Sequence, residues 1–312
     1  MDDSEDVPTE LARGKTNAVG RALGLLGDEW SLLIIQRAVI GATRYGDFLS
    51  QLPISNAVLT GRLQALTKDG ILDRVVYQTN PKRSEYHLTA RSRSLWPLLV
   101  SIWDWERNWV PQHAQVVPAL RHSGCGQDCS PVLQCAACGA VTTSADLDAR
   151  WGPSGSWPRS VPASANRRRP GTGESGSAAG LFPQTMSVFG NKWSAALLIA
   201  AFLGATRFNE FESNLQAPPA SIAERLKVFR ANGILEGTGE YRLTEKGRAF
   251  LPVLISALQW GQRWYRAPEG DAVELTHRPC GERFTGVLAC DKCGDTLTGA
   301  QVSGASPEPG SP

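Results

Sequence analysis

The sequence predicts an α+β protein in which one unit of about 125 residues is present twice. The segment LLGDEWSLLIIQRAVIGATRYGDFLSQL aligns without a gap with VFGNKWSAALLIAAFLGATRFNEFESNL, 163 residues further along the chain. The spacing His-x2-Cys-x9-Cys-x2-Cys begins at His122 and recurs from His277, 155 residues later. The offset changes after Leu72 and Leu235, so the second copy lacks eight residues at one place and otherwise keeps the pattern.

The composition is typical of a globular protein with two domains. The chain has 312 residues, of which 42% are hydrophobic and 20% charged, with a net charge of +2. No apolar run approaches the roughly 20 residues that a membrane-spanning helix needs. The acidic start MDDSEDVPTE lacks the basic and then apolar order of a secretory signal. We therefore expect a cytoplasmic protein without a membrane partner, in which clustered cysteines stay reduced.

The start of the first copy predicts three helices. Asp28 is expected to cap a helix over EWSLLIIQRAVIG, which Gly41 ends. A short amphipathic helix, TRYGDFLSQL, follows. Ser55 is expected to cap the third helix, NAVLTGRLQALTKDG, which Gly70 stops. Leucines recur at helical spacing in this third helix, so one side of it is expected to face the core.

Two strands and a tryptophan-rich helix complete the copy. ILDRVVY and SEYHLT roughly alternate between apolar and polar residues around QTNPKR, where Asn-Pro marks the turn. The helix ARSRSLWPLLVSIWDWERNWV is expected to be kinked by Pro97. Helix, short helix, helix and two-stranded hairpin, in this order, are typical of a winged helix-turn-helix domain.

The chain is expected to divide into two winged helix-turn-helix domains, two small modules and three irregular segments. The linker is rich in Gly, Ser, Pro and Ala, and its RRRPG either enters a minor groove or is simply solvated. The expected segments are a disordered acidic N-terminus (1–14), domain 1 (15–110), module 1 (111–145), a flexible linker (146–180), domain 2 (181–266), module 2 (267–303) and a disordered tail (304–312).

Each module carries four residues that suit a structural zinc ion. Zinc prefers four nitrogen or sulfur ligands in a tetrahedron, and a Cys-x2-Cys followed by glycine presents two thiolates. Four protein ligands leave no position for water, which favours a structural role. The residues between the pairs suffice for a short hairpin that brings the pairs together. We therefore expect two zinc-ribbon-like modules with the ligand sets His122, Cys125, Cys135, Cys138 and His277, Cys280, Cys290, Cys293.

Other interpretations of the cysteines remain open. A redox-active Cys-x-x-Cys usually begins a helix in a thioredoxin-like unit, which the sequence does not resemble. A disulfide leaves an odd cysteine in each His-Cys set and is unfavourable in a reducing cytosol. Unligated cysteines are the remaining alternative. Cys129 has no counterpart in the second copy, so it is either a bystander or a thiol that competes for the metal and makes the first module redox-sensitive.

Several segments of both copies resemble the HxlR-type bacterial transcription regulators. They are RALGLLGDEWSLLII, GATRYGDF, LTGRLQALTKDGIL and YHLTARSRSLWPLLVSIWDW, with their counterparts in the second copy. The resemblance implies a DNA-binding regulator that acts as a dimer through its terminal helices. Some members sense electrophiles or oxidants through a cysteine just before the first helix, where this chain has Asn17. The duplication and the His-Cys modules also depart from the usual single domain.

The third helix of the first copy is the candidate DNA-reading helix. In a helix-turn-helix the second helix of the pair lies in the major groove, and its N-terminal part meets base edges. Asn and Gln pair with adenine and small residues allow close approach, whereas Arg and Lys suit phosphate contacts. The alternative is a merely solvated surface. The candidate residues are Arg44, Ser55, Asn56, Ala57, Thr60, Gly61, Arg62, Gln64, Lys68, Lys82 and Arg83.

The second copy is less suited to DNA. Glu224 stands where the first copy has Gly61, and a carboxylate facing phosphates is unfavourable. The eight missing residues shorten the predicted hairpin to EGTGEYRLT, which has no equivalent of Lys82 or Arg83. We therefore expect the first copy to be the main DNA reader. The second is expected to be a pseudo-dimer partner or to read a weaker half-site. Its remaining candidate residues are Arg207, Ser221, Arg225 and Lys227.

The sequence thus predicts a sequence-specific transcriptional regulator, expected to be a repressor, with double-stranded DNA as its partner and a nucleoid-associated location. A winged-helix adaptor without specific DNA binding is the alternative. An enzyme is disfavoured, because two of the four histidines are assigned to metal and the other two lack a catalytic partner. The two copies pair either within one chain or in a homodimer. Tryptophans of the terminal helices form the core of this pairing or line a pocket for a small-molecule effector; they are Trp96, Trp103, Trp105, Trp109, Trp260 and Trp264.

Overall fold

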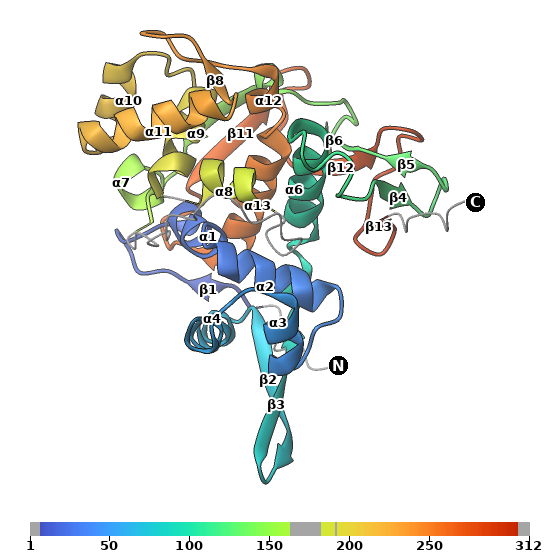
Figure 1. The fold of residues 1–312 in the computed structure, drawn as a ribbon. Helices are drawn as coiled ribbons and strands as arrows, with labels where there is room; N and C mark the ends of the chain where they lie inside the picture. Colours follow the sequence, from blue (N-terminus) through green and yellow to red (C-terminus); the bar gives the residue numbers. More distant parts are fainter. Residues whose placement is uncertain (1–6, 163–181, 191, 305–312) are drawn as a thin grey trace.

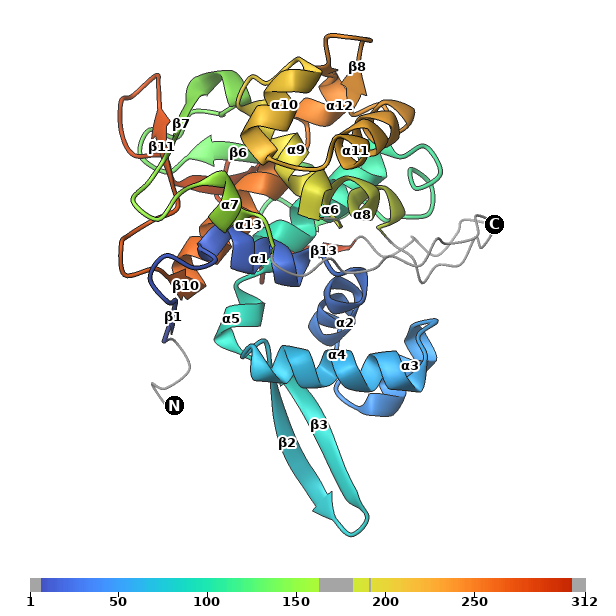
Figure 2. The ribbon, with the colours of Figure 1, turned by 90° about the vertical axis from the view of Figure 1, so that its left-hand side faces the viewer.

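Two winged helix-turn-helix units lie on opposite sides of a layer of helices in the computed structural model, which describes residues 7–162, 182–190 and 192–304 (Figures 1 and 2). Residues 305–312 of the predicted tail and residues 163–180 of the predicted linker lie outside the described residues. No described helix is long and apolar enough to span a membrane. The mixed helices and strands agree with the predicted α+β class.

The first unit follows the predicted order of elements. Asp28 accepts a hydrogen bond from the Ser31 backbone N–H at 2.9 Å, and Ser55 accepts one from Val58 at 3.4 Å, so both predicted caps are confirmed. The elements are α1 (Ala18–Leu26), α2 (Glu29–Val39), α3 (Tyr45–Gln51), α4 (Asn56–Lys68), β2 (Leu72–Thr79), β3 (Lys82–Leu88), α5 (Ala90–Arg93) and α6 (Trp96–Trp109).

The second unit repeats the first with a much shorter wing. Its β8 (Leu235–Glu236) and β9 (Arg242–Leu243) pair over two residues each, whereas β2 and β3 form the long hairpin that projects from the first unit (Figure 1). The helices of this unit are α8 (Pro183–Phe189), α9 (Lys192–Phe202), α10 (Phe208–Leu215), α11 (Pro219–Ala231), α12 (Glu245–Arg248) and α13 (Leu251–Trp264).

Two expectations about the backbone are corrected. Pro97 does not kink one long helix: α5 ends at Arg93 and α6 starts at Trp96, with the proline in the first turn, where its missing N–H leaves no helical bond unmade. The N-terminus is not irregular throughout, because β1 (Thr9–Glu10) pairs in parallel with β10 (Tyr265–Arg266).

The two units pair within one chain, through α6, α13 and the first helix of each copy. The Trp105 indole N–H donates to the Lys246 carbonyl at 3.1 Å, and the Trp260 indole N–H donates to the Arg91 carbonyl at 2.9 Å. These four residues form two pairs of equivalent positions, so the contact has the reciprocal form of a two-fold interface. Trp105, Trp260 and Trp264 are buried, so they belong to the core of the pairing and not to an effector pocket.

The internal symmetry is broken where each terminal helix meets the first helix of the other copy. Buried Glu106 in α6 accepts hydrogen bonds from the N–H and the hydroxyl of Thr185, both at 2.7 Å, and contacts His113 Nδ1 at 2.9 Å. The equivalent of Glu106 in α13 is Gly261, where a Cβ would lie 2.8 Å from the Ala22 Cβ. One side of the interface is therefore polar and the other is a close helix contact.

We expect Glu106→Ala to lower the free energy of unfolding by about 2–4 kcal/mol, because it leaves the buried Thr185 N–H without an acceptor. Urea denaturation followed by tryptophan fluorescence measures this loss. Glu106→Gln is the control, and it should lose less because the amide oxygen can still accept from Thr185. An unfolding curve of Glu106→Ala that overlays the wild-type curve would contradict the role assigned to the carboxylate.

The strands of the two His-Cys segments pair mainly with each other. β6 (Pro131–Cys135) runs antiparallel to β12 (Gly286–Cys290), with Leu133 opposite its own equivalent, Leu288. β4 (Leu120–His122) pairs with β13 (Val302–Gly304) as well as with β5 (Asp128–Cys129), and β7 (Leu147–Trp151) pairs with β11 (Val273–His277). The prediction of two separate zinc-ribbon-like modules is therefore wrong in its topology.

The predicted linker also begins later than expected. Residues 147–151 form β7, and α7 (Trp157–Ser160) packs on α1. The buried Asn17 side chain donates to the Ser160 hydroxyl at 2.9 Å and to the Ser154 carbonyl at 3.1 Å, which fixes this segment against the start of α1. A segment rich in Gly, Ser and Pro is ordered here because tertiary contacts supply its hydrogen bonds.

Candidate metal centres and nucleic-acid interface

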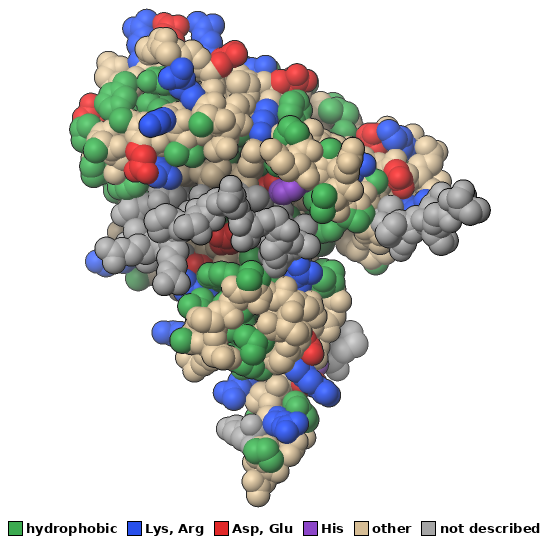
Figure 3. Space-filling view, viewed as in Figure 1, with side chains coloured by type: hydrophobic (Ala, Val, Ile, Leu, Met, Phe, Trp, Pro, Cys, Tyr) green, Lys and Arg blue, Asp and Glu red, His purple; other side chains and the backbone are tan. Residues whose placement is uncertain are grey.

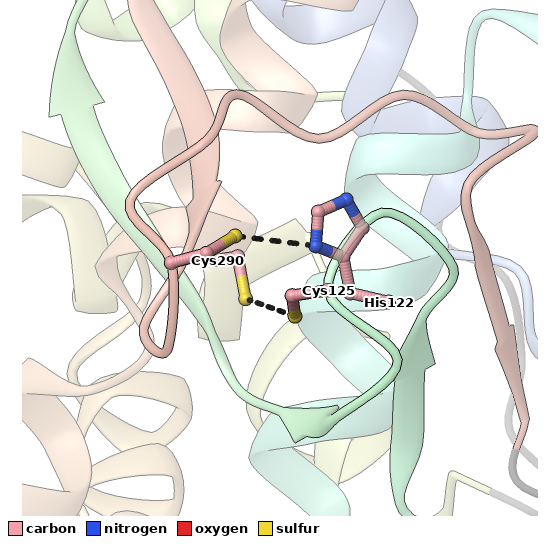
Figure 4. Close-up of side chains that lie close together, drawn as sticks. His122, Cys125 and Cys290 are labelled. Carbon is pink, nitrogen blue, oxygen red and sulfur yellow. Dashed lines mark hydrogen bonds between the residues drawn. The ribbon is translucent and has the colours of Figure 1, made fainter.

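The first candidate metal-binding cluster joins the two halves of the chain. It consists of His122 at the end of β4, Cys125 in the turn that follows, Cys290 at the end of β12 and Cys293 in the turn after it. The Cys125 and Cys290 sulfurs lie 3.9 Å apart, and His122 Nδ1 lies 3.4 Å from the Cys293 sulfur. Figure 4 shows the side chains of His122, Cys125 and Cys290 converging on one point.

The second cluster is the counterpart of the first. It contains Cys135, Cys138, His277 and Cys280. His277 Nδ1 lies 3.4 Å from the Cys138 sulfur and 3.2 Å from the Cys280 sulfur. The other ring nitrogen of His277 lies 3.4 Å from the hydroxyl of Thr142, which helps to fix the orientation of the ring.

Both clusters have the dimensions of a closed tetrahedral zinc site. Zn–S bonds of about 2.3 Å and Zn–N bonds of about 2.0–2.1 Å place two sulfurs about 3.8 Å apart and a sulfur and a nitrogen about 3.6 Å apart. The distances above are close to these values. Each cluster offers four candidate protein ligands, which is the composition of structural zinc sites and not of catalytic ones. The eight candidate ligands predicted from the sequence thus form two clusters of four residues each.

The grouping of the ligands differs from the prediction. Each cluster takes its His-x2-Cys pair from one half and its Cys-x2-Cys pair from the other. The reason is the register of β6 and β12, in which Cys290 lies opposite Pro131, and Cys135 lies opposite Gly286. A strand of five residues carries the chain roughly 13–16 Å, so each Cys-x2-Cys turn is carried away from its own histidine to that of the other half.

The local backbone stabilises thiolates at the ends of both strands. Burial raises the pKa of the Cys290 thiol, but the backbone N–H groups of Cys293 and Lys292 and the neighbouring thiols outweigh it and bring the pKa to about 7. Burial and backbone N–H groups oppose each other in the same way at Cys135, where the pKa is also lowered. Thiolate is the form that binds metal, so these turns suit metal ligation.

Cys129 remains outside the tetrahedral sets. It is buried next to Cys290 and Asp291, and burial together with the Cys290 thiolate raises the pKa of its thiol to about 12. A protonated, buried thiol is a poor nucleophile and a poor ligand. This environment favours the interpretation of Cys129 as a bystander.

The candidate reading helix α4 exposes the predicted surface. Its leucines at 59, 63 and 66 are buried. Tyr45 of α3 lies beside the outward face, and its hydroxyl donates to the Asn56 side-chain oxygen at 2.9 Å and lies 3.3 Å from the Thr60 hydroxyl. Tyr45 is not among the DNA-contacting residues that the sequence predicts. The exposed predicted residues are Ser55, Asn56, Ala57, Thr60, Gly61, Gln64 and Lys68.

The predicted basic residues of the first unit differ in how free they are to contact DNA. Arg62 forms an ion pair with the buried carboxylate of Asp28 at 2.8 Å, so it braces α4 against α2. Arg44 pairs with Glu85 at 2.9 Å and lies over the Tyr77 ring, but its side chain is 59% exposed. Arg83 is exposed on the wing, and the side chain of Lys82 lies outside what the structure describes. Figure 3 shows Lys and Arg side chains around the base of this wing.

The second unit presents a different arrangement of charges at the equivalent surface. Glu224 is exposed on α11 and pairs with Arg225, whose side chain is only 17% exposed. Arg207 pairs with Glu240 at 3.2 Å. Lys227 is exposed, whereas Ser221 is half-buried. The surface of α11 therefore carries an acidic group where α4 carries none.

The fold and the reading helix define a DNA-binding protein of the winged helix-turn-helix class. A model of the HxlR-like helix-turn-helix family matches residues 25–114 and 188–269, more than half of the chain. The chain belongs to this family, which consists of transcriptional regulators and not of enzymes, and the two matches confirm the tandem repeat.

Relatives of the chain have about the length of one copy. An uncharacterized HTH-type transcriptional regulator of Mycobacterium bovis is 36% identical over 141 residues, which are 45% of this chain and 89% of the relative. One of Synechocystis is 36% identical over 97 residues, 31% of this chain and 72% of the relative. A crystal structure of PA1607, a proposed transcription factor, is 32% identical, covers 36% of this chain and 82% of its own, and has a TM-score of 0.32.

Proposed function

We propose that the protein is a sequence-specific DNA-binding repressor in which the first unit is the main reading head and the second is a built-in pseudo-dimer partner. The supporting observation is the contrast between the two reading helices. α4 exposes Asn56, Thr60 and Gln64, which can pair with base edges, next to Gly61, which allows close approach to DNA. α11 exposes Glu224 at the position of Gly61.

The two wings also support a larger role in DNA binding for the first unit than for the second. The long β2–β3 hairpin carries Arg83, and Arg44 lies at its base, so both suit phosphate contacts next to the groove that α4 enters. The short β8–β9 hairpin has no equivalent of Arg83, whereas Arg207, the equivalent of Arg44, keeps its place and pairs with Glu240. Repression follows if the bound protein excludes other proteins from the same stretch of DNA. A nucleoid-associated location follows from DNA binding.

The two clusters are proposed to hold one structural zinc ion each. The metal supplies a tetrahedral cross-link, and its binding free energy stabilises the segments that carry the ligands. Because each set of ligands comes from both halves, each ion joins one half of the chain to the other. A small apolar core between the strands includes Leu133, Leu275 and Leu288. We call this core, together with the two clusters and the strands that carry them, the clasp.

Selection from a random duplex library tests the proposed function without a known operator. We expect the purified chain to enrich one sequence motif, and its affinity for the selected duplex to fall on the order of a hundredfold between 50 and 200 mM salt. An adaptor that has lost DNA contact would enrich no motif, and that result would refute the proposal.

A further inference from the structure

An apolar cavity of about 490 Å³ lies between the two halves of the chain. Its walls come from α1 and α7 of the first half, α9 and α13 of the second, and strands β7 and β11. The volume is within the range of roughly 300–1,000 Å³ typical of small-molecule sites. The predicted effector site among the terminal-helix tryptophans differs from this cavity, because none of those tryptophans lines it.

This cavity lies beside α13, on one side of the internal two-fold. Three of its lining residues in α13 are Leu251, Ala257 and Leu258. The equivalent residues of α6 are larger: Trp96, Ile102 and Trp103. There the Trp96 ring lies close against Gly299, where a Cβ would be 2.9 Å from the indole, and the Trp103 N–H donates to the Pro118 carbonyl at 2.8 Å. Indole rings therefore occupy the space that is open beside α13.

The lining determines the chemistry of the ligand. The Trp151 and Trp157 rings meet edge to face at 5.1 Å, and Phe202 adds a third aromatic surface. Arg150, Asp148 and Arg278 are the charged residues that line the described part of the cavity, and all three are paired: Arg278 with Asp148 at 2.7 Å, and Arg150 with Glu274 at 2.8 Å. A charged ligand would find no free counter-charge there and would lose its hydration.

We infer that this cavity binds one uncharged, aromatic small molecule per chain. The aromatic walls offer edge-to-face and stacking contacts to a flat apolar ligand. Because the walls come from both halves, such a ligand contacts both halves at once. The inference does not rest on the proposed function, because it concerns binding alone.

A fluorescence titration with N-phenyl-1-naphthylamine, an uncharged aromatic probe, tests the inference. We expect saturable binding of one probe per chain. Leu258→Trp introduces into α13 the residue that α6 has at the equivalent position, and it should weaken binding by about tenfold or more because the indole fills the cavity. Leu251→Trp is a second filling variant at a more buried position, and circular dichroism reports whether either variant is folded.

The matched control is Ile40→Trp. Ile40 is the equivalent of the lining residue Leu203 on the other side of the two-fold, and it is 63% exposed. This variant should bind the probe as the wild type does. Unsaturable binding, two probes per chain, or an unchanged affinity in folded Leu258→Trp would each overturn the inference.

Discussion

Replacing His122, Cys125, Cys290 and Cys293 together with alanine is expected to leave a chain that still binds one zinc ion. The four residues form one complete cluster, and the other cluster keeps all its ligands. Replacing His122, Cys125, Cys135 and Cys138 instead should abolish tight zinc binding, because it removes half of each cluster. Zinc content after desalting, measured by mass spectrometry, distinguishes one ion per chain from none.

The two variants each remove four ligands, so each is the control for the other. Structural zinc contributes about 10–16 kcal/mol of binding free energy in zinc-finger peptides, so both losses are expected to destabilise the clasp strongly. The large core of the winged-helix units is separate from the small core of the clasp, and circular dichroism should show that most helices persist. If the first variant bound no zinc and the second bound one ion, each module would hold its own metal. That result would refute the exchange of ligand pairs between the two halves.

Gly61→Glu is expected to weaken binding to a selected duplex by roughly ten- to a hundredfold, because it places a carboxylate near phosphates at low effective dielectric. The change reproduces in α4 the residue that α11 carries as Glu224. Outside the neighbouring residues and backbone of α4 itself, no described atom lies within 4 Å of a Cβ built at Gly61, so the side chain fits the free protein without strain. Glutamate also favours the helix over glycine by about 0.5–1 kcal/mol. DNA affinity should therefore fall while thermal stability is kept or raised.

Gly61→Gln separates charge from size in this experiment. Glutamine has nearly the same shape as glutamate and carries no charge, so it should lose less affinity at low salt. Fluorescence anisotropy measures both affinities, and the thermal midpoint confirms folding. If both variants bound DNA as tightly as the wild type, position 61 would not face DNA and the role of α4 would be wrong.

Local patterns in the sequence were sufficient to predict α2, α3 and α4, two helix caps and the eight candidate ligands. Asp28 and Ser55 cap their helices because a side-chain oxygen close in sequence satisfies a free backbone N–H. The ligands are recognisable because their spacing recurs in both copies. These are short-range features, and they do not depend on how the two copies are arranged.

The exchange of ligand pairs was not predictable in this way. Both copies offer the same donors at the same spacing, so every pairing of a His-x2-Cys with a Cys-x2-Cys has equal chemistry. The choice is made by the antiparallel register of β6 and β12, which depends on contacts between residues about 155 positions apart. Arg62 is a similar case, since its ion pair with Asp28 depends on how α4 packs against α2.

The cavity also required the structure. In sequence, Leu251 and Leu258 are ordinary apolar residues of a helix, and only their superposition on Trp96 and Trp103 shows that space is left. The walls that β7 and α7 contribute to the cavity could not be anticipated, because residues 147–160 have the composition of a linker.

Hydroxyl-radical footprinting of the wild-type chain on a selected duplex tests most directly whether the two halves are unequal readers. If the first unit is the dominant reading head, we expect strong protection of one half-site and weak protection of its neighbour. Two equally protected half-sites, separated by about one helical turn of 10–10.5 base pairs as in a symmetric dimer, would contradict it.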